Sequence, residues 1–138
     1  MPVRFVCAAA PAHPLHQLGR LLTLEDLRRH RHLLVRDSGA RRARAGGWQN
    51  ELRWTVSGKA TSIRAAVMGL GYAWYPEDSV REEIGSGRLK PLPLREGAER
   101  VAQLYLIFAD REAAGPGTLR LAELIREGVK KECLRRAA

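Results

Sequence analysis

The residues best suited to chemistry lie in the stretch Ser57-Gly58-Lys59-Ala60-Thr61, where a predicted strand gives way to a predicted helix. Two hydroxyl groups and one ammonium group fall within this short stretch. The first turn of a helix adds backbone N–H groups that have no intrahelical acceptor, and the positive end of the helix dipole. Such a combination favours anion binding. The alternative is that Ser57 or Thr61 is only the N-cap of the helix, a common role for these residue types.

Acid–base catalysis and metal binding have weaker support in the sequence. Asp78, Glu82 and Glu83 fall on one predicted helix, where carboxylates are usually solvated, and no spacing to a histidine defines a site. Cys7 and Cys133 form no Cys-x-x-Cys or Cys/His pattern that would bind a metal. We therefore expect no enzymatic activity, no cofactor and no metal.

The elements around the Ser57 stretch predict a strand–helix–strand unit. Residues 51–57 alternate apolar and polar side chains, which is typical of a half-buried strand, and residues 60–69 switch to helical spacing. A short apolar strand over residues 72–75 follows. Gly69 or Gly71 can adopt the left-handed conformation that ends a helix, and the second glycine lets the returning strand run close under the helix. These glycines are not a dinucleotide motif, since a GxGxxG sequence must open a helix.

The rest of the chain also alternates strands and helices. Strands are predicted over residues 3–10, 32–36, 89–94 and 102–109, and helices over 24–30, 76–87 and 118–135. Thr23 is the expected N-cap of the first helix, and Gly85 the expected end of the second. The segment 102–109 gives the strongest strand signal, whereas two prolines make 89–94 an edge or crossing strand. This order predicts an α/β fold, a mixed sheet with flanking helices.

The composition limits the possible partners. The chain has 138 residues, enough for one domain, and a formal net charge of +9. Such a charge either reflects arginines spread over a solvated surface or indicates an acidic partner. The dense cluster Arg41, Arg42 and Arg44 keeps open a basic nucleic-acid-binding module that acts through this loop. The two cysteines and the lack of a long apolar run favour a cytoplasmic protein without membrane contact.

Five segments in order resemble the effector-binding domain of LysR-type transcriptional regulators. They are AAAPAHPL (8–15), LTLEDLRRHRHLLVRDSG (22–39), LRWTVSGKATSIRAAVMGLGYAWYPED (52–78), IGSGRLKPLPL (84–94) and VAQLYLIFADR (101–111). Their order and spacing carry the resemblance, which covers about residues 3–130.

The resemblance implies a fold similar to periplasmic binding proteins, with a small effector in a cleft between two α/β subdomains. It places residues 9–92 in the second subdomain, and residues 93–138 in the returning strand and terminal helix of the first. The rest of the first subdomain and the DNA-binding helix-turn-helix have no counterpart in this sequence. The implied partners are a small anionic or aromatic effector, DNA only through that helix-turn-helix, and further copies of the protein in a homo-oligomer.

The resemblance also places effector contacts in three loops. They are His13 and Pro14, then Ser38 and Gly39 after Asp37, and then Ser57, Lys59 and Thr61. In the first loop, His13 could hydrogen-bond an effector carboxylate, or it could simply order the loop. In the second, a backbone turn is the alternative. The third group has independent support, because the free N–H groups and the positive dipole at the start of a helix favour anion binding.

Overall fold

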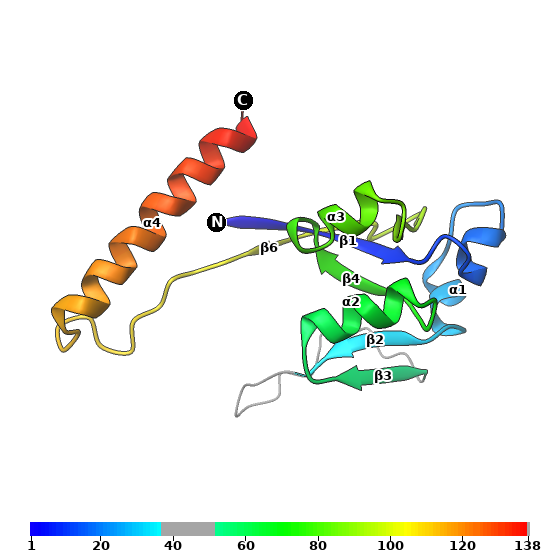
Figure 1. Ribbon diagram of the computed structural model, residues 1–138, viewed down its shortest axis with the longest axis horizontal. Coiled ribbons are helices and arrows are strands. Elements are labelled where there is room, and N and C mark those ends of the chain that lie inside the picture. Colours follow the sequence, from blue (N-terminus) through cyan, green and yellow to red (C-terminus); the bar gives the residue numbers. More distant parts are fainter. Residues whose placement is uncertain (37–51, 138) are drawn as a thin grey trace. The chain divides into compact units, whose positions relative to one another are not determined.

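The computed structural model describes residues 1–36 and 52–137 (Figure 1). It separates into two compact units, Arg4–Val101 and Met1–Val3 with Ala102–Ala138. The strands are β1 (Pro2–Ala9), β2 (His32–Val35), β3 (Arg53–Val56), β4 (Ala73–Pro76), β5 (Lys90–Pro91) and β6 (Glu99–Gln103). The α-helices are α1 (Leu24–Arg28), α2 (Lys59–Val67), α3 (Arg81–Gly85) and α4 (Pro116–Ala137), and the 3-10 helices are η1 (Pro14–Gln17) and η2 (Glu77–Ser79).

The unit Arg4–Val101 is built on mixed β-structure. Strands β2 and β3 pair in parallel, with His32 opposite Arg53. A parallel bridge between His32 and Tyr72 joins β2 to the chain that enters β4, and the Leu33 N–H donates to the Tyr72 carbonyl at 2.9 Å. Strand β1 runs antiparallel to β4 and also pairs with β5 and β6. The mixed α/β fold predicted from the sequence is confirmed.

Apolar side chains form a core on each face of the strands. Because successive side chains of a strand point to opposite faces, Cys7 and Ala8 of β1 belong to different clusters. The first cluster is Cys7, Ala9, Leu15, Leu22, Leu27, Tyr72, Leu92 and Leu94. The second is Ala8, Leu33, Ala65, Ala66, Ala73, Tyr75, Val80 and Leu89. Helix α2 supplies Ala65 and Ala66 to the second cluster, so its orientation is fixed by packing against the strands.

The two glycines after α2 have separate functions. Gly69 has φ +78, and the N–H groups of Gly69 and Leu70 donate to the carbonyls of Ala66 (2.9 Å) and Ala65 (3.0 Å), which is the Schellman end of a helix. Gly71 instead permits a close approach, since a Cβ there would lie 2.5 Å from the carbonyl oxygen of Arg31. The close neighbour of Gly71 is thus the chain entering β2, and not helix α2 as the sequence suggested.

The single helix predicted over residues 76–87 is wrong. The segment is divided into the 3-10 turn η2 and the short helix α3, with Val80 between them. Gly85 is the last residue of α3, and the left-handed residue that ends the helix is Gly87, at φ +74. The N–H groups of Gly87 and Arg88 donate to the carbonyls of Ile84 and Glu83. Val80 is fully buried, which explains why the chain turns there.

The strand prediction for residues 102–109 is also wrong over most of its length. Strand β6 ends at Gln103, and residues 104–107 belong to no strand. A strand needs a neighbour to accept its backbone hydrogen bonds. Leu104 still exchanges hydrogen bonds with Met1, but none of the described strands pairs with residues 105–107. The terminal helix, predicted over residues 118–135, is confirmed as α4.

Strand β3 is more exposed than its alternating sequence predicts. Leu52 and Trp54 are 52% and 47% exposed, although the pattern indicated that they would face a core. In the described part of the chain β3 pairs only with β2, which makes it the last strand on its side. An alternating pattern identifies the two faces of a strand, but it does not show whether a neighbour covers them.

Candidate functional site

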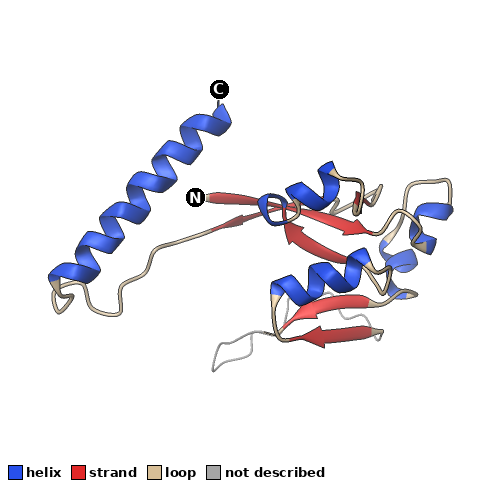
Figure 2. Cartoon of the chain, viewed as in Figure 1, coloured by secondary structure: helices blue, strands red, loops and turns tan. Residues whose placement is uncertain are grey.

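The parallel strands β2, β3 and β4 end at one common edge. Their carboxyl ends are Val35, Val56 and Pro76, and the Arg36 N–H donates to the Val56 carbonyl at 2.8 Å. Figure 2 shows the arrowheads of β2 and β3 at the side where α2 begins. We call this the carboxyl edge. Ligands of open α/β sheets bind beyond such edges, so the Ser57 stretch lies where the fold favours a site.

The beginning of α2 is open to solvent. Its N-cap is Gly58, at φ −150 and ψ 158, and no side chain makes a capping hydrogen bond. Ser57 and Thr61 are therefore not the N-cap, which removes the ordinary structural interpretation of both residues. Both are exposed, and no hydrogen bond joins either side chain to another described residue. The first backbone N–H groups of α2 and two hydroxyls are thus available together at the positive end of the helix.

Lys59 extends this group across the carboxyl edge. Its Nζ donates to the Ser79 hydroxyl oxygen at 2.9 Å, which joins the start of α2 to η2. An ammonium group has three N–H donors, so two remain for a ligand. Sequence reasoning missed Ser79, because the pair is separated by 20 residues. The signal that could have identified Ser79 was Pro76, which marks the end of the predicted strand. Residues that follow parallel strands lie at the same edge of the sheet, so Ser79 could have been expected near Lys59.

The acidic residues of η2 are paired with arginines. Glu77 lies 3.9 Å from the Arg4 guanidinium, and Asp78 makes a short ion pair with Arg81. All four side chains are largely exposed, so these pairs add little stability. Their effect is electrostatic, because each arginine offsets a carboxylate that would otherwise repel an anion beside Lys59.

His13 and Pro14 lie at the opposite edge of the strands. They follow β1, which runs antiparallel to β4, so the end of β1 lies beside the start of β4. His13 is buried, and its Nδ1 accepts the Leu15 N–H at 3.2 Å, at the N-cap of η1. Burial, with the nearby His30 and His16, lowers the pKa of His13 to about 4. The His13 imidazole is therefore neutral at physiological pH and holds its own loop, at the far end of the strands from Lys59.

The second predicted pair, Ser38 and Gly39, lies outside the described residues, as do Asp37 and the cluster Arg41, Arg42 and Arg44. Among the residues that are described, no group of three or more His, Cys, Asp or Glu side chains could hold a metal ion. Cys7 is buried and Cys133 exposed, and both are free thiols. No helix of the described chain is long and apolar enough to cross a membrane.

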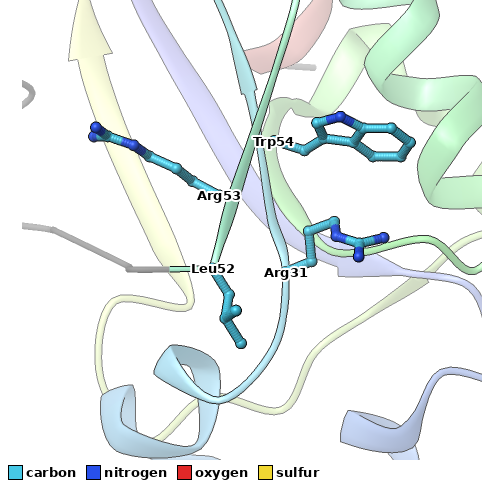
Figure 3. A pocket seen from close by; sticks show the side chains of 4 residues that line it. All are labelled: Arg31, Leu52, Arg53 and Trp54. Atoms are coloured by element: carbon cyan, nitrogen blue, oxygen red, sulfur yellow. The ribbon is translucent and has the colours of Figure 1, made fainter.

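An open hollow of about 480 Å³ lies away from the carboxyl edge, at the amino ends of β2 and β3. Its walls are Arg31, Leu52, Arg53 and Trp54 (Figure 3). The Arg31 guanidinium lies 5.1 Å from the centre of the Trp54 ring, whereas Figure 3 shows Arg53 pointing away from both. The polar groups of a ligand site converge on the ligand. Because the guanidinium groups of Arg31 and Arg53 point in different directions, the hollow is a poorer candidate for a ligand site than the carboxyl edge.

Comparison with known proteins identifies the family. Residues 1–130 match the family described as the LysR substrate binding domain. The chain belongs to this family. A comparison with curated proteins found no significant match. The resemblance deduced from the five sequence segments is thus confirmed, and the fold is that of LysR substrate-binding domains.

Solved structures of LysR-type regulators share this fold. The effector domain of the transcriptional regulator AmpR of Pseudomonas aeruginosa gives a TM-score of 0.67 at 16% identity, over 100% of this chain and 67% of that one. ArgP from Mycobacterium tuberculosis gives 0.57 at 15%, over 91% and 40%. CrgA, a LysR-type regulator from Neisseria meningitidis, gives 0.54 at 21%, over 73% and 36%. The chain spans between 36% and 67% of the length of these three solved proteins.

Proposed function

We propose that this chain is the sensing part of a LysR-type transcriptional regulator and that it binds a small anionic effector at the carboxyl edge. The observation that carries the proposal is the uncapped start of α2, with Ser57, Lys59 and Thr61 exposed beside it. Its donors have no competing acceptor in the described chain except Ser79, which Lys59 contacts. The glycine N-cap Gly58 leaves the first N–H groups of α2 without a side-chain acceptor, and a bound anion can accept from them.

A carboxylate is the ligand group that fits this arrangement. Its two oxygens can accept from the first N–H groups of α2, while the Lys59 ammonium supplies the charge. The hydroxyls of Ser57 and Thr61 add donors at the rim. Because the edge is open to solvent, each contact is worth less than it would be in an enclosed cleft. We therefore expect weak binding to this chain and tighter binding where a second lobe encloses the effector.

The regulatory step follows from differential binding. An effector that binds the closed form of a two-lobed domain more tightly than the open form shifts the population toward closure. In the proposed regulator, the change would reach DNA through a helix-turn-helix, and the protein would act as a homo-oligomer in the cytoplasm. In this proposal the residues of the carboxyl edge bind and do not catalyse.

A thermal-shift titration tests the proposal. Benzoate is a suitable probe because it combines a carboxylate with an aromatic ring. Saturating ligand at about 100 times Kd raises the free energy of unfolding by about 2.7 kcal/mol, and so raises Tm. We expect K59Q to lose this rise and K90Q to keep it, since Lys90 is exposed on β5. A Tm rise that K59Q and K90Q share equally would exclude the carboxyl edge as the site.

The basic nucleic-acid-binding module is tested separately. That function depends on Arg41, Arg42 and Arg44, which the structure does not describe. It predicts that this chain alone binds nonspecific duplex DNA with an affinity that falls steeply with salt. The effector proposal predicts no such binding, because it assigns DNA recognition to the helix-turn-helix.

A further inference from the structure

Ser62 and Tyr75 form a hydrogen bond inside the apolar core between α2 and β4. Their hydroxyl oxygens lie 2.8 Å apart, and the two residues are 0% and 2% exposed. The other members of the core cluster that contains Tyr75 are apolar. Burying a hydroxyl in such surroundings is unfavourable unless it is hydrogen-bonded, and here each hydroxyl is the partner of the other. A satisfied polar pair in a core specifies how the elements that carry it must lie.

The apolar packing of α2 is less specific than this bond. The residues that α2 buries completely are Ser62, Ala65 and Ala66, whereas the larger Ile63 and Val67 are only partly buried at the margin of the cluster. Large side chains that interdigitate hold a helix in one place, and a single methyl group does this poorly. A hydrogen bond has a preferred distance and direction. The bond between the two hydroxyls is therefore the contact that fixes the first turns of α2 on β4.

The same two segments of the chain are joined a second time at the surface, where the Lys59 Nζ donates to the Ser79 hydroxyl oxygen at 2.9 Å. Lys59 precedes Ser62 by three residues, so the two side chains lie on the same side of α2. Ser79 follows β4 and is held by its neighbour Val80, which is fully buried in the same cluster as Tyr75. A lysine side chain is long and flexible, so the position of its ammonium group depends on where the start of the helix lies.

We propose that Tyr75 and Ser62 are positioning residues for the effector site at the carboxyl edge, and that their buried hydrogen bond keeps the Lys59 ammonium within reach of a bound anion. Neither hydroxyl can touch the ligand, because both are buried. The pair acts through the backbone of α2, where the Ser62 N–H also donates to the carbonyl of the N-cap Gly58 at 3.1 Å. The inference rests on the proposed function for the ligand, but the contact between Lys59 and Ser79 can be measured without one.

Matched deletions of two buried tyrosine hydroxyls in the full chain test the proposal. Y75F removes one end of the buried bond, and Y72F removes a hydroxyl that donates to the Leu27 carbonyl at 3.1 Å, in the cluster on the other face of the strands. The first readout is the nuclear Overhauser effect between the side chains of Lys59 and Ser79 without ligand, and the second is the Kd for benzoate. We expect Y75F to lose the Overhauser effect and to bind benzoate about twofold to tenfold more weakly, which is the loss for one disturbed hydrogen bond. Y72F should keep both.

The outcomes separate a positioning role from a purely structural one. Equal effects of Y75F and Y72F on benzoate binding would mean that the hydroxyl serves stability alone, which overturns the proposal. It is also overturned if the wild type lacks the Overhauser effect, or if Y75F binds more weakly while keeping it. S62A/Y75F is a second variant in which neither buried hydroxyl remains unpaired, so its urea midpoint should return toward that of the wild type while its binding stays weak. A wild type that shows the Overhauser effect but does not bind benzoate refutes the proposed function, and the ligand-free measurement on Y75F still decides this inference.

Discussion

Gly71 is the position where a single added methyl group should cost this fold most. In G71A the new Cβ would lie 2.5 Å from the Arg31 carbonyl oxygen and 3.0 Å from Cγ of Leu33. A carbon atom and a carbonyl oxygen approach only to about 3.3 Å at closest. The chain entering β4 must therefore move away from β2 by most of an ångström, because the Arg31 oxygen belongs to the backbone and the Leu33 side chain is buried (2% exposed).

The cost can be estimated from the contacts that this movement disturbs. The Leu33 N–H donates to the Tyr72 carbonyl at 2.9 Å, and the Tyr72 N–H donates to the Arg31 carbonyl at 3.0 Å. Weakening these bonds costs about 0.5–1.5 kcal/mol each, and the strain of overpacking costs about 1–3 kcal/mol. We therefore expect G71A to lower the free energy of unfolding by about 2–6 kcal/mol.

G69A is the informative comparison. Gly69 has φ +78 but open space around the added atom, so only backbone strain opposes alanine there. That strain is worth about 1–2 kcal/mol, part of which is offset because alanine reduces the entropy of the unfolded chain. G85A is the control, since Gly85 ends α3 at negative φ with nothing within 4 Å. We expect G85A to be neutral or stabilising by about 0.5 kcal/mol.

Urea unfolding followed by far-UV circular dichroism measures all three variants. With m near 1–3 kcal/mol/M, the G71A midpoint should fall by about 1 M or more, and the G69A midpoint by less. A G71A chain that is already unfolded in buffer agrees with the estimate, provided that G69A folds. The reasoning is refuted if G69A is destabilised as much as G71A, because the close approach would then contribute nothing.

Two further predictions concern buried polar groups. S62A should lower the free energy of unfolding by about 1–3 kcal/mol, because it removes the only hydrogen-bond partner that the described chain shows for the buried Tyr75 hydroxyl, at 2.8 Å. A double-mutant cycle measured by urea unfolding tests this coupling: Y75F should cost clearly less stability in the S62A background than in the wild type. Burial lowers the pKa of His13 and of His32 from 6.5 to about 4, so between these values the unfolded chain binds more protons. Tm should therefore fall as pH drops from 6.5 to 4. H13N should reduce the dependence of Tm on pH in this range. A pH dependence that H13N leaves unchanged would contradict the lowered pKa of His13.

Local signals in the sequence predicted local structure well. Thr23 was expected to cap a helix, and its hydroxyl accepts the Asp26 N–H while Asp26 accepts the Thr23 N–H, a complete capping box. A glycine after α2 was expected to be left-handed, and Gly69 is. Both features depend on residues a few positions apart, so nothing distant in the chain could change them.

Features that depend on distant neighbours were harder to predict. The segment 102–109 has every strand preference, but a strand forms only where another strand accepts its hydrogen bonds. Leu52 alternates correctly, yet its side chain is 52% exposed. At the candidate site, the exposed Ser57 and Lys59 were predicted from the helix start, whereas Ser79 follows only from the strand order. His13 was grouped with them by the resemblance, and the antiparallel direction of β1 places it at the other edge.

The central claim is that the start of α2 binds an anion. The most direct measurement is a titration of the isotope-labelled chain with benzoate, followed by amide resonances in two-dimensional NMR, with sodium chloride at equal ionic strength as control. The account predicts saturable shifts of the Lys59, Ala60 and Thr61 amides that K59Q weakens at least several-fold and K90Q does not. Shifts that stay linear in benzoate, or that centre on the Arg31 and Trp54 hollow instead, would contradict it.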